Sequence, residues 1–258
     1  MIDKFSHRIL RRMNYISDQA GIFNRYAREL ENWSSHLEKT KQYICDYVLK
    51  NNFNTVSVLG SGWLLDLPVD FLSYNLKKIL LYDVFHPPQI RHKFKKNNRF
   101  ELITADITGG LIAKAYQAAH LYKKSKKKTR ITELEFTGFK PVEETDCYIS
   151  LNILNPLEIV IIDFLKKTRI YTEKELKKLR TLIQESHLKE LPKNKSCLIT
   201  EIEELRYRKE DAPVISKNLL YTPLPEGKNI QTWDWLFDTK GTHNKGYKTA
   251  FKVIAMEI

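Results

Sequence analysis

The sequence predicts an α/β fold with a doubly wound, mainly parallel sheet, an N-terminal helical cap and a C-terminal antiparallel hairpin. Three observations support this prediction. From residue 55 onward, apolar runs rich in β-branched residues alternate with helical segments, which is typical of a parallel sheet covered by helices. Residues 22–51 contain few helix breakers. The last two strand-like runs follow each other without an intervening helix, which indicates a hairpin.

The N-terminal segment has the periodicity of helices. Apolar residues recur at three- and four-residue steps through residues 22–51, beginning with Ile22 and Tyr26. We expect the step Trp33-Ser34-Ser35 to divide two helices, because serine readily caps a helix. The predicted organisation is therefore a helical cap over residues 1–50 and a main domain over residues 51–258.

The elements of the main domain follow in order. We expect strands over residues 55–60, 77–85, 99–109, 145–154 and 196–205, helices over 65–76, 110–122 and 172–191, and a helix or turn over 88–97. Two final strands, 232–238 and 246–258, are joined by TKGTHNK, which suits a hairpin turn. In the first of these strands, Trp233, Trp235 and Phe237 share one face, which predicts that they lie in the core.

The composition limits the classes of protein to consider. Hydrophobic residues make up 42% of the 258 residues, enough for a buried core in a soluble protein. The N-terminus lacks the apolar segment of a signal peptide, and no stretch is long enough to span a bilayer. Cys45, Cys147 and Cys197 are scattered, which disfavours a disulfide framework and a zinc site. We expect a cytoplasmic protein with no metal and no membrane association.

A glycine motif follows the first predicted strand. The stretch VSVLGSG ends at Gly60 and Gly62, and glycine lets another molecule approach the main chain closely. Asp83 ends the second strand at about the 20-residue offset expected for an acid that binds ribose hydroxyls. Asp106 follows the third strand at the same edge of the sheet, where ligands of parallel sheets bind. The combination predicts a nucleoside-binding site.

Two common phosphate-binding motifs are excluded by the residues that follow. A dinucleotide fingerprint needs a third glycine three residues after Gly62, where this chain has Leu65. A P-loop needs a G-K-[ST] sequence, which does not follow either. The ligand is therefore expected to be a nucleoside without a pyrophosphate contact at the glycines.

These motifs resemble the class I S-adenosylmethionine-dependent methyltransferases, a Rossmann-like family. The resemblance covers about residue 40 to the C-terminus. It departs at Val58, where the family usually has an acid, and at Leu64, where it usually has a third glycine. It implies S-adenosylmethionine as the cofactor and the following binding residues: Leu59, Gly60, Ser61, Gly62, Trp63, Asp83, Val84, Asp106 and Ile107. Asp83 would bind the ribose hydroxyls, and Asp106 with Ile107 would flank the adenine.

Catalytic residues are hard to identify, because methyl transfer needs mostly positioning of an already activated donor. Asn152, at the end of the fourth strand, and His86, after the second, are the candidates. The alternatives are a turn asparagine and an ordinary loop histidine. In the family that this chain resembles, enzymes that methylate amino groups of bases or of glutamine commonly carry a polar residue followed by Pro-Pro-aromatic after this strand. Asn155-Pro156-Leu157 has a single proline and no aromatic residue. That departure argues against methylation of amino groups in nucleic acid.

The charge leaves the partner open. The net charge is +12, and residues 123–128 read KKSKKK, which suits an anionic partner but is also common in a solvated loop. A small molecule is the expected methyl acceptor. The alternatives are RNA, favoured by the charge, and a non-catalytic binding protein that retains the fold, favoured by Val58 and Leu64.

Overall fold

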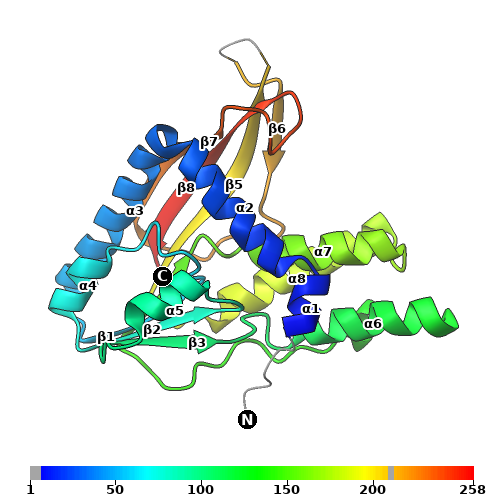
Figure 1. Ribbon diagram of the computed structural model, residues 1–258, viewed down its shortest axis with the longest axis horizontal. Coiled ribbons are helices and arrows are strands. Elements are labelled where there is room, and N and C mark those ends of the chain that lie inside the picture. The colour runs from blue at the N-terminus through cyan, green and yellow to red at the C-terminus, as the bar shows by residue number, and fades with distance from the viewer. Residues whose placement is uncertain (1–6, 209–211) are drawn as a thin grey trace.

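A single eight-stranded sheet organises the protein (Figure 1). The computed structural model describes residues 7–208 and 212–258. The strand order is β3-β2-β1-β4-β5-β8-β7, and β6 pairs with β5. The strands from β3 to β5 pair in parallel, whereas β8 pairs antiparallel with both β5 and β7. The predicted Rossmann-like, mainly parallel fold with an antiparallel C-terminal pair is confirmed.

The elements have the following bounds. The strands are β1 Thr55–Leu59, β2 Lys78–Asp83, β3 Phe100–Thr104, β4 Cys147–Leu151, β5 Ser196–Tyr207, β6 Ile215–Asn218, β7 Lys228–Asp238 and β8 Lys248–Glu257. The helices are α1 His7–Arg12, α2 Tyr15–Arg28, α3 Leu30–Asn51, α4 Val69–Asn75, α5 Pro88–Phe94, α6 Leu111–Ser125, α7 Pro156–Thr168 and α8 Glu173–Glu190.

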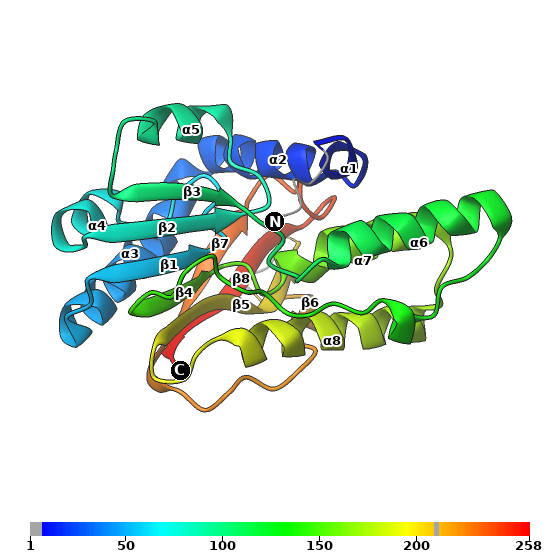
Figure 2. The ribbon, with the colours of Figure 1, turned by 90° about the horizontal axis from the view of Figure 1, so that it is seen from below.

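Both faces of the parallel strands are buried. In β2, Ile79 and Leu81 pack in the core that includes α3, α4 and α5, whereas Leu80 and Tyr82 pack in the core that includes α6, α7 and α8. A strand covered on both faces needs apolar residues at successive positions, which explains the continuous apolar run. Helices α6, α7 and α8 also project together beyond the sheet (Figures 1 and 2).

The break between the N-terminal helices lies at Glu29, between α2 and α3, so the predicted break at Trp33-Ser34-Ser35 is wrong. Trp33 lies inside α3, donates its indole Nε1 to Phe237 O at 2.9 Å and stacks on the Phe237 ring with centroids 5.4 Å apart. This contact with β7 buries the segment and keeps it helical. Trp233, Trp235 and Phe237 are buried, as the strand pattern predicted.

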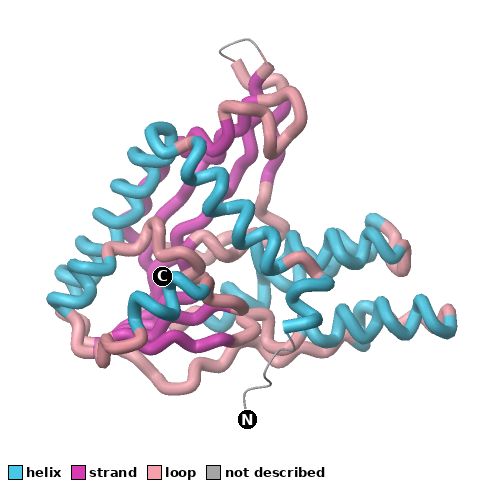
Figure 3. Tube along the Cα trace, viewed as in Figure 1, coloured by secondary structure: helices cyan, strands magenta, loops and turns pink. Residues whose placement is uncertain are grey.

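Two described elements have no counterpart in the sequence prediction. Helix α7 has the sequence PLEIVIIDFLKKT, and so apolar a segment cannot be distinguished from a strand by periodicity. Strand β6 is short and exposed, so its residues show no alternation of buried and exposed positions. The connection from α6 to β4 is a long loop that contains only one short 3-10 turn, Ile131–Glu133, among the described elements (Figure 3).

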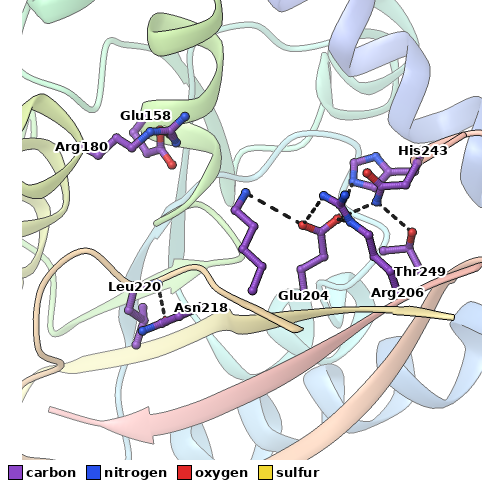
Figure 4. Close-up of polar contacts among 10 residues, drawn as sticks. Glu158, Arg180, Glu204, Arg206, Asn218, Leu220, His243 and Thr249 are labelled. Atoms are coloured by element: carbon purple, nitrogen blue, oxygen red, sulfur yellow. Dashed lines mark hydrogen bonds and ion pairs between the residues drawn. The ribbon is translucent and has the colours of Figure 1, made fainter. Parts of the chain in front are cut away.

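A buried carboxylate anchors the outer end of β5. Arg206 donates Nε and Nη2 to Glu204, both at 3.1 Å, and His243 Nε2 lies 3.8 Å from the same side chain (Figure 4). Asn244 donates Nδ2 to Glu204 Oε1 at 2.6 Å. Burial alone would raise the pKa of Glu204, but the bonds from Arg206 and Asn244 outweigh burial and lower it. The cluster therefore ties β5 to the turn between β7 and β8.

Candidate functional site

The glycine loop follows β1 and is fastened to the end of β2. Gly60 N and Ser61 N donate to Tyr82 O at 2.9 and 3.1 Å. Gly60 has φ +89°, and a Cβ built there would lie 2.8 Å from both Leu151 O and Ile153 Cβ. Only glycine fits this position, because the end of β4 occupies the space that a side chain would need.

Asp83 lies directly against the second glycine. Gly62 N donates to Asp83 Oδ2 at 2.8 Å, and Phe85 N donates to Asp83 Oδ1 at 3.2 Å. Asp83 is 5% exposed, and this burial raises its pKa to about 6, although the backbone N–H donors act in the opposite direction. The structure thus brings together the glycine loop and the strand-end acid that the sequence predicted as neighbours.

Helix α2 covers this part of the edge. The Gln19 amide lies 3.5 Å from Asp83 Oδ1, and Trp63 donates Nε1 to Gln19 O at 2.7 Å. The Trp63 ring stacks on Phe23 with centroids 4.5 Å apart. Trp63 therefore packs against α2. Gln19 and Phe23 were not predicted as site residues, because no motif marks a helix that covers a loop 40 residues away.

Several buried polar atoms at this edge have no hydrogen-bond partner among the described residues. They are Tyr15 Oη, Gln19 Oε1, His86 Nδ1 and Asn152 Oδ1. Burial raises the pKa of Tyr15 well above its ordinary value, and the negative charges of Asp106, Asp18 and Asp83 raise it further. Unpartnered buried polar groups cost free energy. These four, among ten such atoms in the described residues, lie near the glycine loop and are available to a polar ligand there.

Asp106 caps a helix. Its Oδ1 accepts bonds from Thr108 N at 2.9 Å and from Thr108 Oγ1, and its Oδ2 accepts from Gly110 N at 3.1 Å and Ile112 N at 3.2 Å. A carboxylate offers about four acceptor positions, so no oxygen is left for the adenine amino group expected there. The side chains of Leu59 and Ile107 are buried in the core, and Val84 packs against the same core.

His86 supports the glycine loop from beneath. Its Nε2 lies 3.1 Å from Ser61 Oγ, and the side chain is buried. Burial lowers the pKa of His86 to about 4, and the nearby charge of Arg91 lowers it as well. The imidazole is therefore neutral near pH 7 and holds Ser61 in place. This geometry matches a positioning residue better than the catalytic base that was one of its two sequence interpretations.

Asn152 ends β4 in the left-handed conformation, with φ +46°. Its Nδ2 donates to Asp66 Oδ2 at 2.7 Å, and its backbone N–H donates to Ile199 O at 2.8 Å. Burial raises the pKa of Asp66. The pair forms a polar spot beside the glycine loop, with the Asn152 carbonyl oxygen still unpartnered. Asp66 was missed, since an acid in the segment LDLP carries no motif.

Glu201, on β5, is a further buried acid at this edge. Burial raises its pKa to about 7, and the negative charge of Asp66 raises it as well. Asn155 donates Nδ2 to Glu201 O at 2.7 Å and accepts from Gln184 Nε2 at 3.2 Å through its Oδ1. Asn155 is thus engaged inside the protein. Three carboxyl groups thus gather at this edge, of which Asp83 and Glu201 are buried and Asp66 is half-buried.

The described residues contain no group of histidine, cysteine, aspartate and glutamate side chains arranged to hold a metal ion. Among the same residues, no helix combines the length and the apolar character needed to cross a membrane.

Comparison with known proteins gives structural likenesses only. No protein family and no curated protein matches the sequence. The chain is similar to the N-methyltransferase NodS from Bradyrhizobium japonicum WM9 in complex with S-adenosyl-L-homocysteine, at 11% identity and TM-score 0.40, with 85% of each chain covered. It is also similar to an S-adenosylmethionine-dependent methyltransferase from Clostridium acetobutylicum ATCC 824, at 10% identity and TM-score 0.38, covering 91% of this chain and 81% of that one. An rRNA methylase from Streptococcus thermophilus matches at 10% identity and TM-score 0.31, with 83% and 93% covered.

Proposed function

We propose that this protein is an S-adenosylmethionine-dependent methyltransferase whose cofactor binds at the carboxyl edge of β1 and β2, beneath α2. The observation that carries the proposal is the contact of the Asp83 carboxylate with the bare main chain of Gly62, beside the unpartnered oxygens of Gln19 and Tyr15. A carboxylate accepts hydrogen bonds from ribose hydroxyls. Above about pH 6 the Asp83 carboxylate is ionised and attracts the positive sulfonium.

The residues present fit this cofactor if the Gln19 side chain turns away from Asp83. The Gln19 amide lies 3.5 Å from Asp83, at the outer limit of a hydrogen bond, so this rotation costs little and leaves the bond from Trp63 to Gln19 O in place. Ribose hydroxyls would then replace Gln19 on Asp83 Oδ1. Because the Asp106 carboxylate is saturated, adenine would be held by contacts other than that side chain.

The acceptor end of the site is assigned to Asn152 and Asp66. When bound, S-adenosylmethionine supplies an activated methyl group, so the protein needs chiefly to orient the acceptor and exclude water. The unpartnered Asn152 Oδ1 can accept an N–H or O–H of the acceptor, and Asp66 holds the Asn152 amide in that orientation.

Calorimetry tests the cofactor directly. We expect both S-adenosylmethionine and S-adenosylhomocysteine to bind to the intact protein with one site per chain. The non-catalytic alternative would give no heat with either ligand up to millimolar concentration. That result would also remove the methyltransferase proposal.

Cofactor affinity is expected to fall below pH 6. Because burial raises the pKa of Asp83 to about 6, the carboxylate is ionised at about pH 7.5 and largely protonated at about pH 5. A ligand that needs the ionised form then binds about tenfold more weakly at the lower pH. Titrations of S-adenosylhomocysteine at both values measure this change, and Asp83→Asn should remove the dependence. An equally steep fall in that variant would assign the titration to another group.

Removal of the Asn152 side chain is expected to reduce methyl transfer about 10- to 100-fold with little change in cofactor affinity, because the acceptor loses its orienting contact. The test variant is Asn152→Gly, because glycine adopts the positive φ of this position without strain. Asn194→Gly is the matched control, since Asn194 is also left-handed, with φ +60°, but exposed. Transfer of tritiated methyl groups to total RNA and to a small-molecule extract provides the measurement. Equal rates in the two variants would contradict the assignment.

A further inference from the structure

A half-open pocket of about 320 Å³ lies where α1, α6 and α7 meet. It is separate from the glycine loop and from the residues assigned to the cofactor. Three helices contribute its lining residues, which are Arg12, Tyr116, Ala119, His120, Lys123 and Phe164. The volume is at the lower end of small-ligand pockets, so it suits a single planar group better than an extended molecule.

The pocket combines flat aromatic surfaces with cationic groups. The Tyr116 ring is nearly parallel to Phe164, with an interplanar angle of 18° and centroids 5.9 Å apart, and to His120, at 7° and 6.4 Å. Arg12 donates Nη1 to the Tyr116 hydroxyl, which places a guanidinium at the rim. Lys123 adds a second cation, and no acid belongs to the lining. Such a pocket favours a planar ring that carries negative charge next to it.

A basic surface continues from the pocket to the end of the projecting helices. Residues 123–128 lie at the end of α6, and Lys166, Lys167 and Arg169 lie at the end of α7. The two ends are joined, because Tyr171 donates its hydroxyl to Thr129 O at 2.9 Å. Within the described residues, Lys128 and Lys166 pair with acids, whereas Lys123, Lys124, Lys126 and Lys127 have no ion pair. The uncompensated charge is therefore concentrated on the helix end next to the pocket.

We propose that this surface, defined by the pocket and by residues 123–128, 166, 167 and 169, binds single-stranded RNA. Lysines along the helix ends would contact successive phosphates, and one base would stack in the pocket on Tyr116. Aromatic stacking beside cations distinguishes single-stranded nucleic acid from a membrane surface, which would meet the lysines without stacking a planar ring on Tyr116.

The helix that carries most of this surface begins at the sheet edge of the proposed cofactor site. Helix α6 starts at the loop capped by Asp106 and carries Tyr116 and Lys123 away from the sheet edge. RNA held along α6 would therefore lead toward that edge, which makes RNA the methyl acceptor. This last step rests on the proposed function, whereas RNA binding does not.

Fluorescence anisotropy with a labelled single-stranded RNA of mixed sequence tests the proposal, using the intact protein without cofactor. The variant Lys123→Glu/Lys124→Glu changes two exposed lysines of the surface, and Lys95→Glu/Lys96→Glu makes the same charge change on two exposed lysines after α5. We expect the first variant to bind about tenfold more weakly at about 0.1 M salt and to reduce the salt-dependence slope by about 1.4, for two lost phosphate contacts. The second should stay within about twofold of the parent protein.

The stacking contact needs its own variants. Tyr116→Leu should weaken binding of the single strand about fivefold, because the base loses its stacking partner, whereas Tyr116→Phe keeps the ring and should bind like the parent. Circular dichroism checks that both variants fold. A duplex of the same sequence should bind more weakly than the single strand.

Three results would overturn the proposal. The first is that the protein does not bind RNA at about 50 mM salt. The second is that the two lysine variants lose the same RNA affinity. The third is that the duplex or phosphatidylserine vesicles bind more tightly than single-stranded RNA. Calorimetry with S-adenosylhomocysteine on the same variants keeps the two proposals apart. We expect the Lys123→Glu/Lys124→Glu variant to bind RNA more weakly and to bind the cofactor normally. If the parent protein binds RNA but no cofactor, only the methyltransferase proposal is refuted.

Discussion

Replacement of Asp83 by alanine is expected to weaken S-adenosylmethionine binding about 10- to 150-fold, or about 1.5–3 kcal/mol, the scale of a hydrogen bond to a charged group. The carboxylate would accept the ribose hydroxyls, and Asp106 cannot replace it, because its oxygens are already occupied by Thr108 and the start of α6. Titration calorimetry of the parent protein and the variant measures the change.

Two controls make this result interpretable. Asp83 also accepts bonds from Gly62 N and Phe85 N, so Asp83→Asn, which keeps the shape and one acceptor oxygen, separates loss of the ligand contact from collapse of the loop. Asp234→Ala removes an exposed aspartate of β7 and should leave the affinity unchanged. An Asp83→Ala protein that is folded and binds normally would show that the ribose lies elsewhere.

Substitution of Gly60 by alanine is expected to destabilise the whole protein by about 3 kcal/mol. The added Cβ would lie 2.8 Å from Leu151 O, a backbone atom that cannot move without disturbing β4. Overpacking of this kind costs about 1–3 kcal/mol. The left-handed backbone, with φ +89°, adds about 1–2 kcal/mol for any residue with a Cβ. Urea denaturation gives the change in the free energy of unfolding.

Gly110 is the matched control for this substitution. It has a similar φ of +99°, but a Cβ there would meet no atom within 4 Å. Gly110→Ala should therefore show only the backbone contribution, about 1–2 kcal/mol. If the two variants lost the same stability, the close approach of Leu151 to Gly60 would not be the reason for the glycine.

The sequence predicted the parts of the fold that depend on local patterns. Strand–helix alternation identified the parallel sheet, and the pair of final strands identified the antiparallel end. That Gly62 and Asp83 lie close together followed from topology alone, because the carboxyl ends of adjacent parallel strands meet at one edge of the sheet. The same reasoning could not reveal that α2 lies over this edge, since no local pattern specifies which surface a helix covers.

Side-chain roles were predicted less well than positions. Asp106 was expected to flank the adenine, and its carboxylate is bonded to the start of α6. His86 has the expected position but supports Ser61. A carboxylate or imidazole has the same sequence signature whether its partner is a ligand or the backbone, so only the hydrogen bonds distinguish the two.

By itself, the sequence determined the α/β class, the order of the strands along the chain and the edge at which their polar residues gather, because these follow from hydrophobic periodicity and strand direction. Only the tertiary structure determined that Gly60 faces β4, that Gln19 covers Asp83, and that Arg12, Tyr116 and Lys123 line one pocket. Those contacts join residues that are far apart in the sequence. Their geometry depends on how the helices pack on the sheet, and no local pattern of residues specifies that packing.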